Sequence, residues 1–417
     1  MKLERERQRI ERYIMENIDG VLKPPRSFIH YPFIDPGSVY DGNVWDWDSY
    51  WSVYGLLGMA DILPKATLDR VLVHAKGNVM NFFDHQLEDG YIPMMIEVAD
   101  WPEPYLNMMR RKGFHMNMHK PFLCGQIALI SRFTVDWSWA TGYAEALERY
   151  FACYDREFFD AERGLYVWID DIMIGMDNDP ASFGRPKSST ANIFLNAFMV
   201  EELRCMAEYL RAQGDPARAE AYLEKRTALI AAIQAECWDD RDGFFYSVDV
   251  DVKTRKLDWF HQGLGVFWKT LPIRIRTWSG FIPLWAGFAT PAQAERLAAE
   301  AFNPETFGSD FGVCTLAKNE RMFNLSATNN PSNWLGPIWL VANYVVFRGL
   351  LNYGFRDGAA RLCERSARLL AADLERTGCL HEYYDPFTGA PVMNGGFINW
   401  NILALNMMRE LEAGGMY

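Results

Sequence analysis

Apolar residues recur along this chain with the spacing of amphipathic helices. Within residues 190–212, for example, Leu195, Phe198, Met206 and Leu210 form one apolar stripe. The pair Asp215-Pro216 then supplies an N-cap and a first helical residue for the next segment. Similar patterns predict helices at 3–18, 49–60, 66–86, 121–133, 137–154, 190–212, 216–237, 263–269, 277–288, 291–301, 335–353, 357–376 and 399–412. Strand signals are few and short, as at 244–250 after an Asp-Gly turn.

The links between the predicted helices alternate between short and long. Residues 213–215 are a short link, whereas the long links are rich in Gly, Pro, Asp and Trp and lie at 19–48, 87–120, 155–189, 238–262, 302–333 and 377–398. Their centres recur about every seventy residues, which indicates a structural repeat. Alternating links between antiparallel helices place every long link at one end. We predict an all-α fold, a closed (α/α)6 toroid formed as one domain over residues 1–417; a two-domain array or open solenoid is the alternative.

The closed ring makes a geometric prediction about two acidic residues. Asp177 lies in the third long link and Glu382 in the sixth, so three hairpins separate them and they face each other across the mouth. Two facing carboxyl groups are what hydrolysis of a glycosidic bond requires, one as general acid and one as general base or nucleophile. Opposite walls favour the inverting geometry, with the carboxyl groups about 6.5–9.5 Å apart.

Each acid also has a structural interpretation. Asp177 could simply open the turn in Asp177-Asn178-Asp179-Pro180, or join Asp170, Asp171 and Asp179 in a calcium loop, although the spacing differs from that of an EF-hand. Glu382 could be a surface residue on a short strand before the Asp385-Pro386 turn.

Two aromatic stretches suit a sugar site. The segment 44–51 reads Val-Trp-Asp-Trp-Asp-Ser-Tyr-Trp, and segment 329–339 contains Trp334 ahead of Gly336-Pro337. Trp faces cover the apolar side of a pyranose and an Asp accepts hydroxyl hydrogen bonds. The structural alternative is an aromatic core patch, with Asp48 or Ser49 as the N-cap of a helix.

Charge and composition exclude several classes. The chain has 417 residues, is 49% hydrophobic and carries a net charge of −12, which disfavours nucleic acid and anionic membranes as partners. Its seven cysteines include no CxxC pair and are interpreted as reduced, mostly buried thiols without a metal site. The charged N-terminus predicts a cytoplasmic protein without a signal peptide. A basic cluster at 110–120 is either a solvated face or a pocket for an anionic aglycone.

Together these stretches resemble glycoside hydrolase family 63, in the same clan as the family 37 trehalases. Trp47-Asp48-Ser49-Tyr50-Trp51 is similar to a trehalase-type motif, and Gly175-Met176-Asp177-Asn178-Asp179-Pro180 to the family's Gly-Met-Asp-Asn-Ser-Pro, whose Asp is the general acid. The segments 382–389 and 336–350 resemble the general-base segment and the Gly-Pro-Ile-Trp region. The resemblance covers residues 40–410. It implies an (α/α)6 barrel and an inverting α-glycosidase without a cofactor.

The resemblance also assigns roles. Asp177 is expected to protonate the glycosidic oxygen and Glu382 to deprotonate water, with Asp48 binding the −1 sugar. The expected substrate contacts are Tyr40, Trp45, Trp47, Asp48, His119, Lys120, Gly175, Trp334, Tyr383 and Trp400. The chain departs from the family at Leu335, where Arg is usual, at His119-Lys120-Pro121, and at Asp179, where Ser is usual.

These departures bear on the substrate. A small α-glucoside is expected, with α-mannosides, glucosylglycerate, mannosylglycerate and trehalose as alternatives, and Lys120 suits an anionic aglycone. A homo-oligomer is compatible with the sequence. Rival functions are an inverting phosphorylase, which would lack the base, an epimerase using His119, His261 or His381, and a sugar-binding protein without catalysis.

Overall fold

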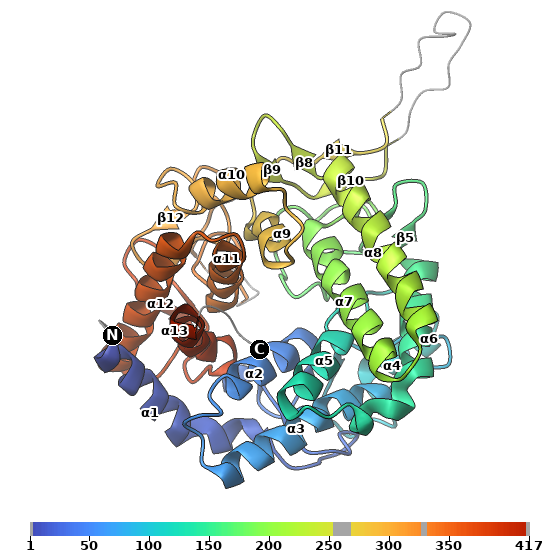
Figure 1. Cartoon of the computed structure of the whole chain (residues 1–417), viewed down its shortest axis with the longest axis horizontal. Coiled ribbons are helices and arrows are strands. Elements are labelled where there is room, and N and C mark those ends of the chain that lie inside the picture. Colours follow the sequence, from blue (N-terminus) through green and yellow to red (C-terminus); the bar gives the residue numbers. More distant parts are fainter. Residues whose placement is uncertain (1–2, 253–267, 327–331, 414–417) are drawn as a thin grey trace, which may run out of the picture.

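The helices form two concentric rings. The computed structural model describes residues 3–252, 268–326 and 332–413 (Figure 1). In these residues the inner ring consists of α2 (Asp46–Leu57), α5 (Leu123–Thr134), α7 (Ile193–Ala212), α9 (Ile282–Trp285), α11 (Leu340–Asn352) and α13 (Leu403–Ala413). The outer ring consists of α1 (Glu4–Val21), α3 (Lys65–Asp84), α6 (Ala144–Glu157), α8 (Pro216–Glu236), α10 (Pro291–Ala301) and α12 (Arg356–Thr377). The fold is therefore the all-α (α/α)6 barrel that the alternating links predict.

Both rings close on themselves. The last inner helix, α13, packs against the first, α2, and the outer helices α1 and α12 pack side by side. Neighbouring inner helices are in contact around the whole circle, through α2–α5, α5–α7, α7–α9, α9–α11 and α11–α13. This closure excludes the open solenoid.

Local sequence signals account for several helix boundaries. The side chain of Asn192 accepts a hydrogen bond from the backbone N–H of Phe194 at the start of α7. Asp215 caps α8 through Arg218 N–H, with Pro216 as the first helical residue. Thr290 and Gln293 form a reciprocal capping box at α10. These caps satisfy backbone donors that the first helical turn leaves unpaired.

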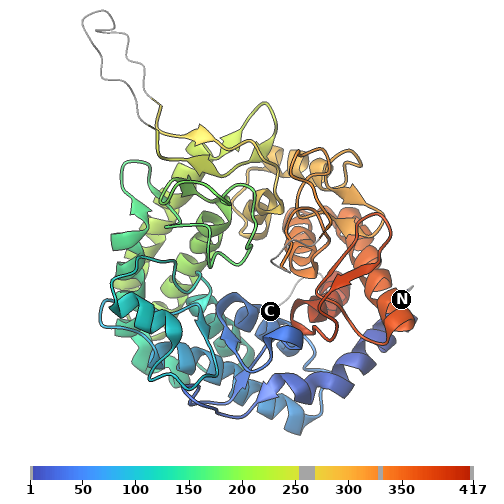
Figure 2. The same ribbon diagram turned by 180° about the vertical axis from the view of Figure 1, so that it is seen from behind.

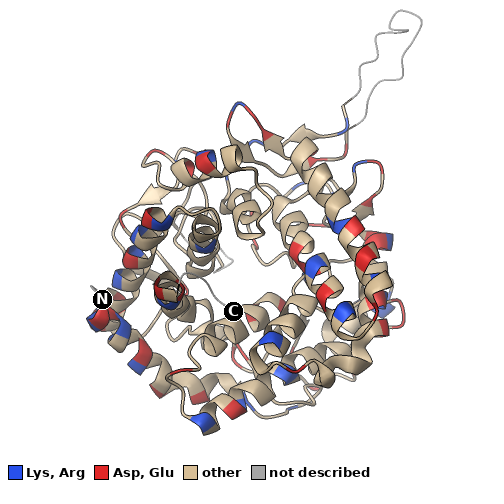
Figure 3. Ribbon diagram, viewed as in Figure 1, with Lys and Arg blue, Asp and Glu red and all other residues tan. Residues whose placement is uncertain are grey.

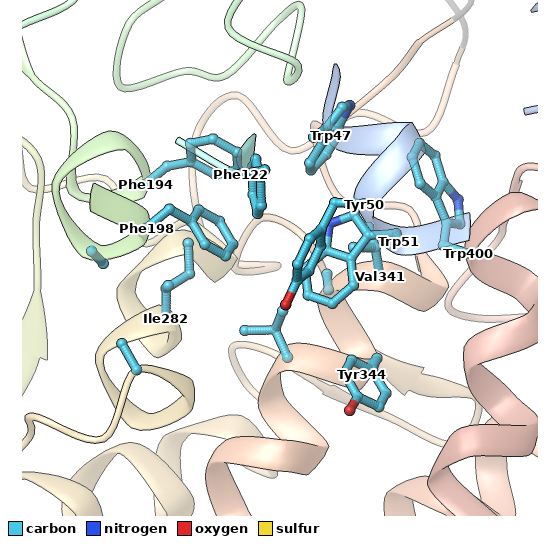
Figure 4. Packing of buried hydrophobic residues seen from close by; sticks show 14 of the residues in the cluster. Trp47, Tyr50, Trp51, Phe122, Phe194, Phe198, Ile282, Val341, Tyr344 and Trp400 are labelled. Carbon is cyan, nitrogen blue, oxygen red and sulfur yellow. The ribbon is translucent and has the colours of Figure 1, made fainter. Parts of the chain in front are cut away.

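Aromatic residues of the inner helices pack against one another inside the barrel (Figure 4). Trp51 of α2 is fully buried, with ring centroids 6.4 Å from Phe198 of α7 and 5.8 Å from Tyr344 of α11. Phe122, just before α5, lies 4.6 Å from Phe198. The aromatic layer forms a floor under the mouth of the barrel.

The long links gather at one end of the ring, which Figure 2 shows as a surface of loops and short strands. These strands are β1 (Leu22–Lys23), β2 (Phe33–Ile34), β3 (Val44–Trp45), β4 (Met95–Ile96), β5 (Phe159–Asp160), β6 (Leu165–Tyr166), β7 (Thr190–Ala191), β8 (Trp238–Asp239), β9 (Phe244–Phe245), β10 (Val248–Asp249), β11 (Leu271–Pro272), β12 (Gly308–Ser309), β13 (Gly312–Val313), β14 (Tyr383–Tyr384) and β15 (Pro391–Met393). They pair antiparallel, mostly as two-stranded ribbons; β10 pairs with both β7 and β11.

Several predicted boundaries were wrong. α2 begins at Asp46 with Trp45 as N-cap, so neither Asp48 nor Ser49 caps it. α11 begins at Leu340 instead of residue 335, because Ile338 forms a backbone bridge with Tyr384. A short helix, α4 (Tyr105–Arg111), lies in the second long link, where none was predicted.

Two segments predicted as single helices each consist of a 3-10 turn followed by an α-helix. The helix predicted at 137–154 consists of a 3-10 turn, Ser138–Tyr143, followed by α6, and the helix predicted at 277–288 consists of a 3-10 turn, Trp278–Phe281, followed by α9. A 3-10 turn, Asn399–Ile402, likewise precedes α13. The helix predicted at 263–269 falls mostly outside the described residues.

Charged side chains concentrate on the outer helices and loops, while the inner ring carries few of them (Figure 3). All seven cysteines are free thiols and six are buried, as predicted; Cys379 is half-buried. Among the described helices, none has both the length and the apolar character that a bilayer crossing demands.

Candidate active site

Glu382 lies directly before β14 and is almost completely buried, with 1% of its surface exposed. Its backbone N–H donates to Met393 O across the β14–β15 ribbon. Each carboxylate oxygen accepts one side-chain hydrogen bond: Oε1 from the Tyr40 hydroxyl at 2.9 Å, and Oε2 from the Asn394 amide. The surface-strand interpretation of Glu382 is therefore wrong, because the side chain points into a polar cluster.

Burial raises the pKa of Glu382 to about 7, while the hydrogen bonds from Asn394 and Tyr40 oppose this rise. The negative charge of Asp177 also raises the pKa of Glu382. Burial and the charge of Glu382 raise the pKa of Tyr40, which keeps its hydroxyl protonated as the donor. Asp177 is therefore near enough for its charge to act on Glu382, although the two residues are far apart in the sequence.

The loop that carries Asp177 is called the acid loop here and comprises residues 175–180. Asp177 is half-buried within a turn closed by the hydrogen bond from Asp179 N–H to Met176 O, 2.8 Å long. The indole N–H of Trp278 lies 3.1 Å from Met176 Sδ. The turn predicted at these residues is thus present.

Asn178 ties the acid loop to the segment before α11. Its Oδ1 accepts from Trp334 N–H at 2.7 Å, and its Nδ2 donates to Asn333 Oδ1 at 3.0 Å. Asp179 instead turns into the protein, where Asn192 Nδ2 donates to it at 2.7 Å and the Ser182 hydroxyl at 3.2 Å. Burial raises the pKa of Asp179 to about 6.

Aromatic rings form a continuous layer between the two acidic segments. The centroid of Trp47 lies 5.7 Å from that of Trp334 and 5.3 Å from that of Trp400. Tyr383 stacks on Trp339, which in turn lies 5.6 Å from Trp400. The indole N–H groups of Trp45 and Trp400 are buried without an acceptor in the described residues, so each is a candidate donor to a sugar hydroxyl.

Asp48 lies in the first turn of α2, beside this aromatic layer. It is 7% exposed, and Asn399 Nδ2 donates to its Oδ1 at 2.5 Å. Burial and the neighbouring Asp46 raise the pKa of Asp48 well above its ordinary value, whereas the Lys120 ammonium lowers it.

The basic cluster at 110–120 is largely paired with carboxylates. Arg110 contacts Asp89 at 2.7 Å and also pairs with Glu157. Lys120 is 2% exposed and its Nζ lies 2.8 Å from Asp46 Oδ1. The cluster is therefore divided: Arg111, Lys112 and His115 are exposed and form the predicted solvated face, whereas the buried Lys120 is already paired with Asp46.

His119 faces the core. Its ring packs edge-on against Phe82, with centroids 4.5 Å apart, and Nδ1 lies 2.6 Å from Lys120 O. Burial lowers the pKa of His119 to about 4, so the ring is neutral. Of the other histidines considered for an epimerase, His381 bonds Asp373 through Nδ1 at 2.9 Å, and His261 lies outside the described residues.

Sequence reasoning missed two polar residues of the site, Asn394 and Asn399. Asn394 holds Glu382 and has a positive φ of 55°, and it precedes Gly395-Gly396. An Asn followed by Gly is a turn signal that could have drawn attention to it. Asn399 holds Asp48 and adjoins Trp400, a predicted contact.

The acidic residues of the proposed calcium loop have other partners. Asp170 Oδ2 lies 3.3 Å from Lys187 Nζ, and Asp171 accepts from Gly184 N–H at 2.7 Å. Across residues 3–252, 268–326 and 332–413, no group of His, Cys, Asp and Glu side chains could hold a metal ion.

This double ring of helices is the (α/α)6 barrel of the glycoside hydrolases. Comparison with known proteins narrows the class. A family model described as the mannosylglycerate hydrolase MGH1-like glycoside hydrolase domain matches residues 41–400, and the chain belongs to this family, within glycoside hydrolase family 63.

Curated relatives agree with this membership. A mannosylglycerate hydrolase from Thermus thermophilus is 29% identical over 197 residues, covering 45% of this chain and 38% of the relative. Human trehalase is 22% identical over 421 residues, covering 90% of this chain and 66% of that protein. The matches thus span less than two thirds of these relatives' lengths.

Solved structures share the fold. A mannosylglycerate hydrolase from Thermus thermophilus, crystallised with glucose, superimposes with a TM-score of 0.67 at 21% identity, covering 95% of this chain and 99% of that one. A neutral trehalase from Saccharomyces cerevisiae superimposes with a TM-score of 0.59 at 17% identity. The match covers 92% of this chain and 76% of the trehalase chain.

Proposed function

We propose that the protein hydrolyses a small α-glycoside with inversion of the anomeric configuration. Asp177 is the general acid and Glu382 the general base. Asp48, Trp45, Trp47, Trp334 and Trp400 surround the sugar at the −1 position. The lead candidates for the substrate are α-hexosides of glycerate, with mannose or glucose as the hexose.

In the proposed reaction, Asp177 gives its proton to the glycosidic oxygen as the bond from that oxygen to the anomeric carbon breaks. Glu382 removes a proton from a water molecule, whose oxygen attacks the anomeric carbon from the opposite face. The products are the free sugar in the β configuration and the alcohol of the aglycone. Glu382 ends protonated and Asp177 ionised, and proton exchange with solvent restores both.

The observation that carries this proposal is the state of Glu382. Its carboxyl group is buried and is held by Tyr40 and Asn394, and burial raises its pKa to about 7. A general base works best when its pKa lies near the operating pH. A phosphorylase needs no such base, so this feature favours hydrolysis over phosphorolysis.

The proposal that the aglycone is glycerate rests on similarity to known proteins. The description of the matched family model names mannosylglycerate hydrolase. A structural neighbour that is a mannosylglycerate hydrolase was crystallised with Tris and D-glycerate. The α-glucoside expected from the sequence motifs is retained as the second substrate class, because human trehalase aligns along 90% of this chain.

A substrate panel followed by proton NMR tests the proposal. Mannosylglycerate, glucosylglycerate, trehalose and an aryl α-glucoside are incubated with the purified protein in water, with and without inorganic phosphate. We expect a glycerate glycoside to be cleaved fastest, with the β-anomer of the sugar appearing first.

Each other outcome identifies a rival. Initial release of the α-anomer would contradict inversion, and strict dependence on phosphate would indicate a phosphorylase. Conversion of a free sugar to its epimer would indicate an epimerase. Binding of the sugars without turnover would identify a sugar-binding protein.

A further inference from the structure

Lys120 makes two bonds to one buried carboxylate. Its Nζ lies 2.8 Å from Asp46 Oδ1, and its backbone N–H donates to Asp46 Oδ2 at 2.7 Å. The side chains are 2% and 0% exposed. Asp46 Oδ1 also accepts from the backbone N–H of Trp47 at 2.7 Å. The lysine therefore clamps the start of α2, where Trp47 and Asp48 lie.

The side chain of the same lysine also packs against Gly175, the first residue of the acid loop. A β-carbon at Gly175 would lie 3.2 Å from Lys120 Cε and 3.2 Å from the Trp47 ring. Gly175 has a φ of +87°, a conformation that other residues rarely adopt. The acid loop thus begins on a platform made by the lysine stem and Trp47, two residues before Asp177.

We propose that Lys120 is a positioning residue that braces the start of α2 against the acid loop, and that it does not bind an anionic aglycone. The inference rests on the proposed function for Asp177 and Asp48. From the sequence alone, Lys120 is expected to bind an anionic aglycone such as glycerate. The inference replaces that role with a structural one.

The charges around Lys120 support this role. An ammonium group donates three hydrogen bonds. One goes to Asp46, and Met94 Sδ lies 3.8 Å from Nζ. A buried cation that already neutralises a buried carboxylate has little net charge left for another anion. Its remaining influence falls on Asp48, whose pKa it lowers against the effects of burial and Asp46.

Substitution of Lys120 distinguishes a structural role of this residue from a role in binding the aglycone. Lys120→Met keeps much of the apolar stem and removes the ammonium. We expect kcat to fall about 10- to 100-fold, as small misplacements of catalytic groups do. KM for glycerate glycosides and for a neutral α-glucoside should change by the same factor. Lys318→Met is the matched control, because Lys318 is a half-buried lysine bonded to Gly308 O.

Hydrogen exchange followed by mass spectrometry gives a readout that needs no substrate. In Lys120→Met, amides of residues 172–180 should exchange at least threefold faster than in the wild type, while those of α12 stay unchanged. If the proposed hydrolase activity is absent altogether, this measurement still decides whether the brace exists.

A second variant covers the case in which Lys120→Met does not fold. The Asp46→Asn/Lys120→Met double variant removes both charges of the buried ion pair, and the faster exchange of residues 172–180 is expected there too. The proposal is overturned if exchange in the acid loop is unchanged in a folded variant. It is also overturned if only KM for the glycerate glycosides rises, since that would make Lys120 the ligand of the aglycone carboxylate.

Discussion

The acid loop and the β14–β15 ribbon hold the two proposed catalytic carboxyl groups in different ways. Glu382 is 1% exposed and both of its oxygens are bonded by side chains, those of Tyr40 and Asn394. Asp177 is half-buried on an irregular turn, and the bonds that fix this turn come from its neighbours Met176 and Asn178.

The difference fits the two tasks. A base that must take a proton from one water molecule gains from a fixed orientation and a pKa near neutrality, which burial provides. An acid that meets the glycosidic oxygen needs access to the substrate, and Asp177 is the more exposed of the two residues. The contrast teaches that the proposed base is fixed and buried, while the proposed acid stays nearer to the surface of the mouth.

Removal of either carboxyl group should have the largest effect. Asp177→Asn and Glu382→Gln are each expected to lower kcat by about 10²–10⁴-fold, the usual contribution of one acid–base group. Steady-state rates on the best glycoside measure this loss. Asp69→Ser, which changes an exposed carboxylate of α3, is the control and should retain full activity.

An activated leaving group distinguishes the two roles. An aryl glycoside with a good leaving group needs little protonation, so it should restore much of the rate in Asp177→Asn and little in Glu382→Gln. Equal restoration in both variants would contradict the assignment of acid and base.

The next largest effect concerns the direct support of the base. Asn394→Ala removes a hydrogen bond that stabilises ionised Glu382, so the pKa of Glu382 should rise above 7. The base is then ionised only at higher pH, and the acidic limb of the kcat/KM profile should move up by about one pH unit. Rates at pH 7 would fall up to about tenfold.

Two companion variants test the origin of that shift. Tyr40→Phe removes the second bond to Glu382 and should move the same limb in the same direction. Asn352→Ala changes an asparagine that bonds Trp285 O on the other side of the barrel floor, and should leave the profile unchanged. An unshifted profile in both Asn394→Ala and Tyr40→Phe would mean that a group other than Glu382 sets the limb.

The sequence predicted the fold well because loop spacing and helix periodicity both report the same repeat. The asymmetric alternation of links is sufficient to place the long loops at one end, and the caps of α7 and α8 are local signals. The boundaries of α2 and α11 were mispredicted because tertiary pairing, β3 with β4 and Ile338 with Tyr384, decides where these helices begin.

The arrangement of the candidate site could be predicted in part, although its role stays a prediction. The motifs gave the residues of the aromatic layer, which the structure brings together as Trp47, Trp334 and Trp400. The partners of Lys120 and the inward orientation of His119 could not be predicted, because both depend on contacts with distant segments. Asn394 was missed because its role depends on the pairing of β14 with β15.

The two hydrogen bonds that tie Asn178 to the segment before α11 predict an intermediate effect for its substitution. Asn178→Ala leaves the buried backbone N–H of Trp334 without its acceptor. This should destabilise the fold by about 1–3 kcal/mol, as measured by thermal unfolding, and lower kcat several-fold through displacement of the acid loop. Asn324, whose Oδ1 accepts from the backbone N–H of Ser326 in its own loop, provides the control Asn324→Ala. Unchanged stability and rate would show that the turn holds Asp177 without Asn178.

Asp179 should have the smallest effect on catalysis and a distinct effect on stability. Burial raises the pKa of Asp179 to about 6 in the folded protein, above its ordinary value of 3.8. Between these values the folded state binds the proton more tightly than the unfolded state, so this carboxyl group stabilises the fold at low pH and loses that contribution as pH rises through about 6. Asp179→Ser lacks the effect.

The melting temperature of Asp179→Ser should therefore rise relative to the wild type between pH 4 and 7, by an amount corresponding to at most about 3 kcal/mol. Lost bonds to Asn192 and Ser182 lower its stability by a similar amount at every pH, so the slope of the difference is the informative quantity. Asp69→Ser should run parallel to the wild type over this range. If Asp179→Ser also runs parallel, Asp179 is ionised throughout, and the acid loop rests on a buried charge held by hydrogen bonds alone.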